Sequence, residues 1–148
     1  MEHEISIQQI KEYSPQLLED INNLLIQLNP EIKPLSEKNL LDILNDSSVY
    51  LFAALRNNRV IATTTLVIYK TLCGKRANIE DVVVDKDARG NGLGKKLVGE
   101  ATKKATEEEV PHINLTSHPD RTAANHLYQS LGFKKRETNV YRLYLQEE

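Results

Sequence analysis

Apolar residues at helical spacing dominate the N-terminal part of the chain, after a first strand predicted near Ile5. Ser14 and Pro15 supply an N-cap and a proline at the first helical position, and Asn29-Pro30 ends that helix. A shorter helix is predicted after Ser36. The apolar face of the first helix consists of Leu17, Leu18, Ile21, Leu24, Leu25 and Leu28.

The middle of the chain is rich in β-branched residues and predicts strands. Residues 49–55 and 60–69 flank Asn57-Asn58, a pair that tolerates the positive φ of a tight hairpin. Residues 79–84 form the next strand. Its unbroken Val82-Val83-Val84 predicts burial on both faces, and therefore a central position in the sheet.

The remaining chain alternates helices and strands. A helix follows the glycines at 90, 92 and 94, a short strand covers 113–115, and a helix over 121–131 ends at Gly132. From Phe133 onward the chain is predicted to return as strand, with Tyr141, Leu143 and Leu145 alternating with other residues. We therefore expect a mixed α/β protein of one domain over residues 1–148, with six or seven strands and about four helices.

The composition and charge of the chain argue against several classes of function. The 148 residues carry a net charge of −2, without a long basic run, which argues against nucleic acid as a partner. The chain start lacks a secretion signal, the single Cys73 cannot form an intramolecular disulfide, and no apolar run would span a bilayer. A cytoplasmic location without membrane contact is expected. The histidines fall on separate predicted elements, so no metal is expected.

The segment Arg89-Gly90-Asn91-Gly92-Leu93-Gly94 lies between a strand and a helix. Glycines leave backbone N–H groups uncovered, and a helix N-terminus attracts anions, so this segment predicts an anion site. The nucleoside triphosphate pattern would need glycine at Arg89 and Ser or Thr at Lys96. The dinucleotide pattern would need glycine at Lys95.

The pattern Arg89-x-x-Gly92-x-Gly94 resembles the acetyl-coenzyme A signature of the GNAT superfamily of N-acetyltransferases. A second segment, residues 123–133, resembles the part of that family that follows the fifth strand. Residues 79–84 also look like the equivalent strand of glucosamine-phosphate N-acetyltransferases. The resemblance implies the GNAT fold, a mostly antiparallel twisted sheet, with acetyl-CoA as co-substrate.

Glu80 matches the acidic position used by several aminoglycoside N-acetyltransferases. A primary amine is protonated at neutral pH, so a carboxylate that takes its proton would help catalysis. Glu80 is the predicted base; alternatively it is a strand acid paired with a lysine, or a water chain is the base. Strand alternation predicts that Asp81 points to the opposite face.

Tyr128 matches the tyrosine of the family that protonates the departing coenzyme thiolate; the alternative is a core tyrosine. The resemblance further implies an oxyanion donor in the backbone near Val82 or Val83, where the strand parts from its neighbour. The predicted coenzyme-binding residues are Val82, Val83, Val84, Arg89, Gly90, Asn91, Gly92, Leu93, Gly94, Lys95 and Asn125.

The function that these residues predict is transfer of acetyl from acetyl-CoA to a primary amine, by direct attack in a ternary complex. A small amine or amino sugar is the first choice of acceptor, bound near residues 29–35 and 137–139. A protein or peptide amine is the second, and a non-catalytic acyl-CoA sensor is the alternative from another class. A homodimer is a further expectation from the family.

Overall fold

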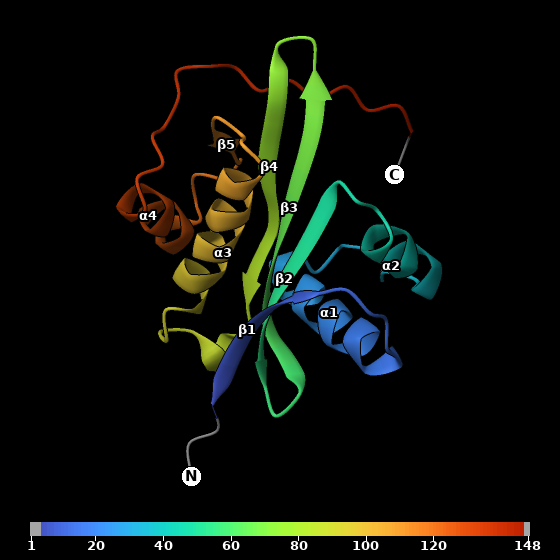
Figure 1. Ribbon diagram of the computed structural model, residues 1–148. Helices are drawn as coiled ribbons and strands as arrows, with labels where there is room; N and C mark the ends of the chain where they lie inside the picture. Colours follow the sequence, from blue (N-terminus) through green and yellow to red (C-terminus); the bar gives the residue numbers. More distant parts are fainter. Residues whose placement is uncertain (1–3, 147–148) are drawn as a thin grey trace. The chain divides into compact units, whose positions relative to one another are not determined.

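The computed structural model describes residues 4–146, whose contacts divide the chain into two units, Met1–Thr116 and Ser117–Glu148. The first unit contains one sheet in the order β1-β2-β3-β4-β5, antiparallel except for the β4–β5 pair (Figure 1). The strands are β1 (Ile5–Ile10), β2 (Val49–Arg56), β3 (Arg59–Thr71), β4 (Gly74–Val84) and β5 (Ile113–Asn114). The helices are α1 (Pro15–Leu28), α2 (Glu37–Leu44), the 3₁₀ helix η1 (Lys86–Ala88) and α3 (Leu93–Glu107).

Local sequence signals explain where the first helices begin. The Ser14 hydroxyl accepts from Leu17 N at 3.0 Å, and the Ser36 hydroxyl accepts from Asn39 N at 3.1 Å. Each serine thereby satisfies one of the backbone donors that a helix N-terminus leaves unpaired. Both predicted caps are confirmed.

The β2–β3 hairpin is also confirmed. Asn57 and Asn58 have φ values of 55° and 63°, the left-handed conformation that a two-residue hairpin turn requires. This turn pairs Leu55 with Val60, and the register then shifts between Leu55 and Ala54, so that Ala54 pairs with Ala62.

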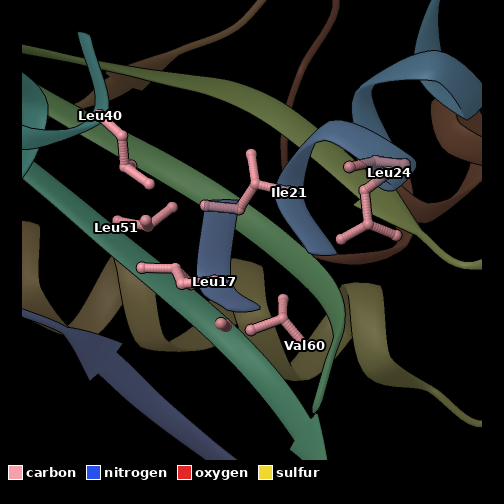
Figure 2. Close-up of a cluster of buried hydrophobic side chains, with 8 residues drawn as sticks. Leu17, Ile21, Leu24, Leu40, Leu51 and Val60 are labelled. Atoms are coloured by element: carbon pink, nitrogen blue, oxygen red, sulfur yellow. The ribbon is translucent and has the colours of Figure 1, made fainter. Parts of the chain in front are cut away.

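Helices cover both faces of the sheet in the first unit. α1 and α2 lie on one face and α3 lies on the other (Figure 1). Figure 2 shows the first of these layers, where leucines of α1 and α2 meet Leu51 and Val60 of the sheet. The buried cluster consists of Leu17, Ile21, Leu24, Leu40, Leu51, Ala53, Val60 and Val83.

Asp20 joins α1 to the start of β3. Its side chain is 4% exposed and accepts from Arg59 Nη2 at 2.6 Å and from Val60 N at 2.9 Å. Gln16 donates to the same carboxylate at 3.1 Å. A buried carboxylate is tolerated when donors surround it, and here the donors come from two elements that are distant in sequence.

The second unit contains α4 (Thr122–Ser130), followed by Gly132 at φ 95°. This positive φ confirms the predicted helix stop. The prediction of strand from Phe133 onward is wrong for the described residues, because residues 133–145 carry no strand pairing. The sheet of the described chain therefore has five strands in place of the predicted six or seven. Alternating side chains give a segment strand propensity, but a strand forms only where an edge pairs with it.

Within residues 4–146, no helix is both long enough and apolar enough to cross a lipid bilayer.

Candidate active site

The glycine loop, defined here as residues 89–94, leads from η1 into α3. Gly92 is the N-cap of α3 at φ 72°, and no side chain caps the helix there. Lys96 N makes the first intrahelical bond, to Gly92 O at 3.1 Å. The amides of the three residues between them have no acceptor in the helix, because a helix leaves its first N–H groups unpaired. These amides belong to Leu93, Gly94 and Lys95.

The space above the glycine loop is open. A Cβ added to Gly90 or Gly92 would meet no heavy atom within 4 Å, so an incoming group can approach the backbone there. Gly90 has a φ of 85°, a conformation that L side chains rarely adopt. Unpaired amides, the positive end of a helix and open space together suit a phosphate or diphosphate group.

The polar side chains of the glycine loop serve its own geometry. Arg89 Nε donates to Val84 O at 3.2 Å, and Asn91 Nδ2 donates to Ala88 O at 3.0 Å. Arg89 is exposed, so the rest of its guanidinium faces solvent above the end of β4. Lys95 is also exposed in the first turn of α3 and adds positive charge to the loop.

α1 contacts the segment that leads from β4 toward the glycine loop, at Asp85 and Lys86, and sequence reasoning missed this contact. Gln27 Oε1 accepts from Lys86 N at 2.9 Å, and Gln27 Nε2 donates to Asp85 Oδ1 at 3.3 Å. Asp85 N in turn donates to Ile61 O of β3 at 2.8 Å. A glutamine at this helical position carries no sequence signal, since its partners lie nearly sixty residues away.

β4 presents a free edge beside the glycine loop. Its pairing with β5 ends at Asn78 and Asn114, and among the described residues no strand pairs with Val82, Val83 or Val84 on that side. On the other side, Val83 pairs with Thr63 and its side chain is buried. The free edge agrees with the parting of strands that the family resemblance implies.

A β-bulge interrupts β4 just before this edge. The register jumps from the pair Thr65–Glu80 to the pair Thr63–Val83, so Asp81 and Val82 together oppose a single residue of β3. Asp81 has a φ of 54°, which is uncommon for a residue with a side chain.

The bulge brings both acidic side chains to one region. Glu80 pairs with Thr65, and Thr65 Oγ1 donates to Asp81 Oδ2 at 3.2 Å. Cross-strand partners share a face, and Thr65 also pairs with Leu51 of the core under α1 and α2. The prediction that Asp81 points to the opposite face of the strand from Glu80 is therefore wrong. The extra residue of the bulge breaks the period of two on which that prediction depended.

The environment of Glu80 raises the pKa of its carboxyl group. Partial burial raises the pKa of Glu80 above its ordinary value, and the neighbouring charge of Asp81 raises it further. The side chain remains exposed enough to reach solvent or a bound molecule. No lysine is paired with Glu80 among the ion pairs of the described residues, so the alternative of a structural strand pair has no support there.

The second unit holds Tyr128 and Asn125 on α4. Tyr128 is 6% exposed, and its ring meets Phe133 edge-on at a centroid distance of 6.0 Å. Burial raises the pKa of Tyr128, although the charge of Arg121 opposes the shift, so the phenol keeps its proton at neutral pH. Asn125 Nδ2 donates to His118 O at 3.0 Å, which leaves the side-chain oxygen of Asn125 as an acceptor.

Histidine, cysteine and acidic side chains do not gather in groups of three or more anywhere in residues 4–146.

The fold is one that acetyltransferases adopt. The chain belongs to the acetyltransferase (GNAT) family, whose model matches residues 18–133. It is similar to the glucosamine 6-phosphate N-acetyltransferase of Candida albicans, with 36% identity over 78 residues. That match covers 51% of this chain and 50% of the relative, so the chain spans about half the length of that enzyme.

Two solved structures share the fold. An aminoglycoside acetyltransferase from an uncultured soil metagenomic sample superposes with a TM-score of 0.85, at 20% identity over 97% of both chains. The aminoglycoside N-acetyltransferase AAC(6′)-Iy, solved in complex with CoA, gives a TM-score of 0.79 at 20% identity. The latter match covers 99% of this chain and 98% of that one. At these identities the two structures establish the fold alone.

Proposed function

We propose that this acetyltransferase moves an acetyl group from acetyl-CoA to the primary amine of a small molecule, by direct attack within a ternary complex. The observation that carries the proposal is the glycine loop, with its uncapped amides and open space at the N-terminus of α3. The family model covers residues 18–133 and so includes parts of both units, which supports a single N-acetyltransferase domain over residues 1–148.

In this proposal the loop binds the diphosphate of the coenzyme. The backbone amides of the α3 N-terminus donate to its oxygens, and the exposed Arg89 and Lys95 add positive charge. The free edge of β4 at Val82, Val83 and Val84 offers N–H and C=O groups to the amide-bearing arm of the coenzyme. One of these N–H groups polarises the thioester carbonyl.

Glu80 is the base and Tyr128 the acid in the proposed reaction. A carboxylate whose pKa is raised accepts the ammonium proton of the acceptor more readily than an ordinary glutamate. The acceptor nitrogen then attacks the carbonyl carbon, the carbon–sulfur bond breaks, and the nitrogen gives its second proton to solvent, from which Tyr128 later regains the proton that it donates. Tyr128, which keeps its proton at neutral pH, donates that proton to the departing sulfur.

The acceptor class is an amino sugar or a related small amine. The Candida albicans relative is named for such a substrate, and the acidic pair at the β4 bulge would attract a protonated amine. The protein is proposed to work in the cytoplasm without nucleic acid, membrane or metal.

The test is thiol release from acetyl-CoA with a panel of amines: glucosamine 6-phosphate, an aminoglycoside, a diamine and a peptide with a free N-terminus. We expect release with at least one of the small amines. Tyr128→Phe and Glu80→Gln should each lower kcat by roughly 10²-fold, with unchanged affinity for CoA. Release with the peptide alone would support a protein N-acetyltransferase, and tight acetyl-CoA binding without release would support a sensor.

A further inference from the structure

Three consecutive threonines, Thr63, Thr64 and Thr65, lie in the middle of β3 among apolar residues. All three are buried, with exposures of 4%, 0% and 9%. Burying a hydroxyl costs free energy unless it is hydrogen-bonded, and valine has nearly the same shape and is also favoured in strands. Hydroxyls at these positions therefore indicate a role for hydrogen bonding.

The β-bulge of β4 lies opposite these threonines. Thr64 opposes the bulge itself, and Thr63 and Thr65 lie on either side of it. Thr63 Oγ1 donates to the main-chain oxygen of Asp81 at 3.2 Å. Thr65 Oγ1 donates to the carboxylate of the same residue, also at 3.2 Å. The two hydroxyls thus fix both the main chain and the side chain of Asp81.

Asp81 is a residue that needs such support. Its φ of 54° is a conformation that L side chains rarely adopt and that persists only where surrounding contacts fix it. Its neighbours in β4 are the proposed base Glu80 on one side and the free edge at Val82 and Val83 on the other. A change in the conformation of Asp81 would therefore move both parts of the proposed site.

The hydroxyl of Thr64 differs from those of its neighbours. Side chains alternate along a strand, so Thr64 lies on the opposite face of β3 from Thr63 and Thr65. Among the described residues, Thr64 Oγ1 has no hydrogen-bond partner. The same strand therefore carries two buried hydroxyls that bind the bulge and one that does not.

We propose that Thr63 and Thr65 are positioning residues of the acetyl transfer, because their hydroxyls hold the bulge at Asp81 in place. The bulge in turn sets where Glu80 and the free edge of β4 lie relative to the bound substrates. A displacement of about 1 Å between reacting groups can cost about 10²-fold in rate. This inference rests on the proposed function, to which it adds two residues that act through a third.

Two substitutions at each position separate positioning from packing. Thr65→Val keeps the shape and removes the donor, so kcat should fall about 10- to 100-fold. Its melting temperature should change little, because Asp81 is exposed and water can replace the lost donor. Thr65→Ser keeps the donor and removes a buried methyl group, so its melting temperature should fall while kcat stays within about threefold of the parent. Thr63→Val and Thr63→Ser should behave in the same two ways.

Thiol release with an amine that the parent acetylates measures kcat, and calorimetric titration measures the affinity for CoA. The affinity should be the same in all variants, because the threonines lie outside the glycine loop that is proposed to bind the coenzyme. Thr64→Val is the matched control. It removes a buried hydroxyl that has no partner, so it should keep the kcat of the parent and melt at the same or a higher temperature.

The possible outcomes distinguish this inference from the proposed function. If the parent acetylates an amine and Thr63→Val and Thr65→Val match its kcat, the positioning role is overturned and the proposed function stands. The role is also overturned if kcat follows the melting temperature across the variants, if CoA affinity falls together with kcat, or if Thr64→Val loses as much activity as its neighbours. A parent that acetylates none of the amines overturns the proposed function, and the positioning role with it.

Discussion

At the scale of single residues, Asp81 shows how one backbone conformation changes the candidate chemistry. Asp81 has a positive φ and lies in the bulge that gives β4 one extra residue. Thr65 donates a hydrogen bond to the Asp81 carboxylate on the side of the sheet where Glu80 lies. Two neighbouring carboxylates resist simultaneous ionisation, which is one cause of the raised pKa of Glu80. Local geometry thus makes Glu80 a better proton acceptor near neutral pH than an isolated strand glutamate.

The raised pKa of Glu80 has a measurable consequence for stability. An acid whose pKa is higher in the folded state binds more protons than its unfolded counterpart, so the protein loses stability as pH rises from the unfolded pKa to the folded one. Below about pH 4 the carboxyl group of Glu80 is mostly protonated in both the folded and the unfolded chain. Glu80→Gln should therefore melt at the temperature of the parent there. At pH values above the folded-state pKa of Glu80, the variant, which cannot ionise, should melt at a slightly higher temperature than the parent.

Calorimetry of both proteins across this range checks the direction. The gain stays small because solvent screens a partly exposed carboxylate. A difference in melting temperature that is constant with pH would show that Glu80 has an ordinary pKa. A variant that is less stable than the parent at neutral pH would show that the charge of Glu80 is stabilised by folding.

At the scale of secondary-structure elements, the contact between α1 and the start of β3 depends on the buried carboxylate of Asp20. Asp20→Ala leaves Arg59 and the Val60 amide without their acceptor, so we expect a loss of about 2–4 kcal/mol in the free energy of unfolding, measured by urea titration. The Lys38–Asp42 pair is a control because both side chains are mostly exposed. Asp42→Ala should cost less than about 0.5 kcal/mol. Equal losses would mean that burial of Asp20 adds nothing.

A second contact links α1 to Asp85 and Lys86, in the segment that leads to the glycine loop. Gln27→Ala removes both hydrogen bonds to Asp85 and Lys86, which should let the loop entry move and raise KM for acetyl-CoA about three- to tenfold. The value of kcat should change less than twofold, because Gln27 contacts the segment that leads to the loop and is not placed among the reacting groups. Asn23→Ala, at an exposed position one helical turn earlier, should leave both constants unchanged. A fall in kcat with constant KM would contradict a positioning role.

Some of these elements can be predicted from sequence, and others cannot. Caps such as Ser14 and turns such as Asn57-Asn58 are local, because the residues that make them are neighbours in the chain. The bulge at Asp81 depends on register against β3, and the support from Gln27 depends on a contact between distant segments. The alternation in residues 140–145 predicts a strand that the described structure does not contain, because the sequence pattern does not specify a partner edge.

At the scale of the whole molecule, the proposed coenzyme site is made mostly of backbone. The glycine loop, the α3 N-terminus and the free edge of β4 offer main-chain groups held by the sheet and by α1. In the sequence, such a site is therefore recognised from residues that lack a side chain, such as Gly90 and Gly92. A family signature built on glycine positions is the expected result of such a design.

This backbone site yields a prediction about ligand-linked stability. A ligand present at 100 times its dissociation constant stabilises the folded protein by about 2.7 kcal/mol, so CoA should raise the melting temperature of the parent. Gly92→Asn keeps a residue that tolerates positive φ but places a side chain over the amides, and should weaken CoA binding in calorimetric titration at least tenfold. Gly99→Ala, at an exposed position inside α3, should bind CoA like the parent and melt at a higher temperature without ligand.

Undiminished CoA affinity in Gly92→Asn would place the diphosphate elsewhere, whereas equal losses of affinity in both variants would trace the effect to the helix as a whole. A selective loss in Gly92→Asn is the result that an anion bound directly by the main chain requires.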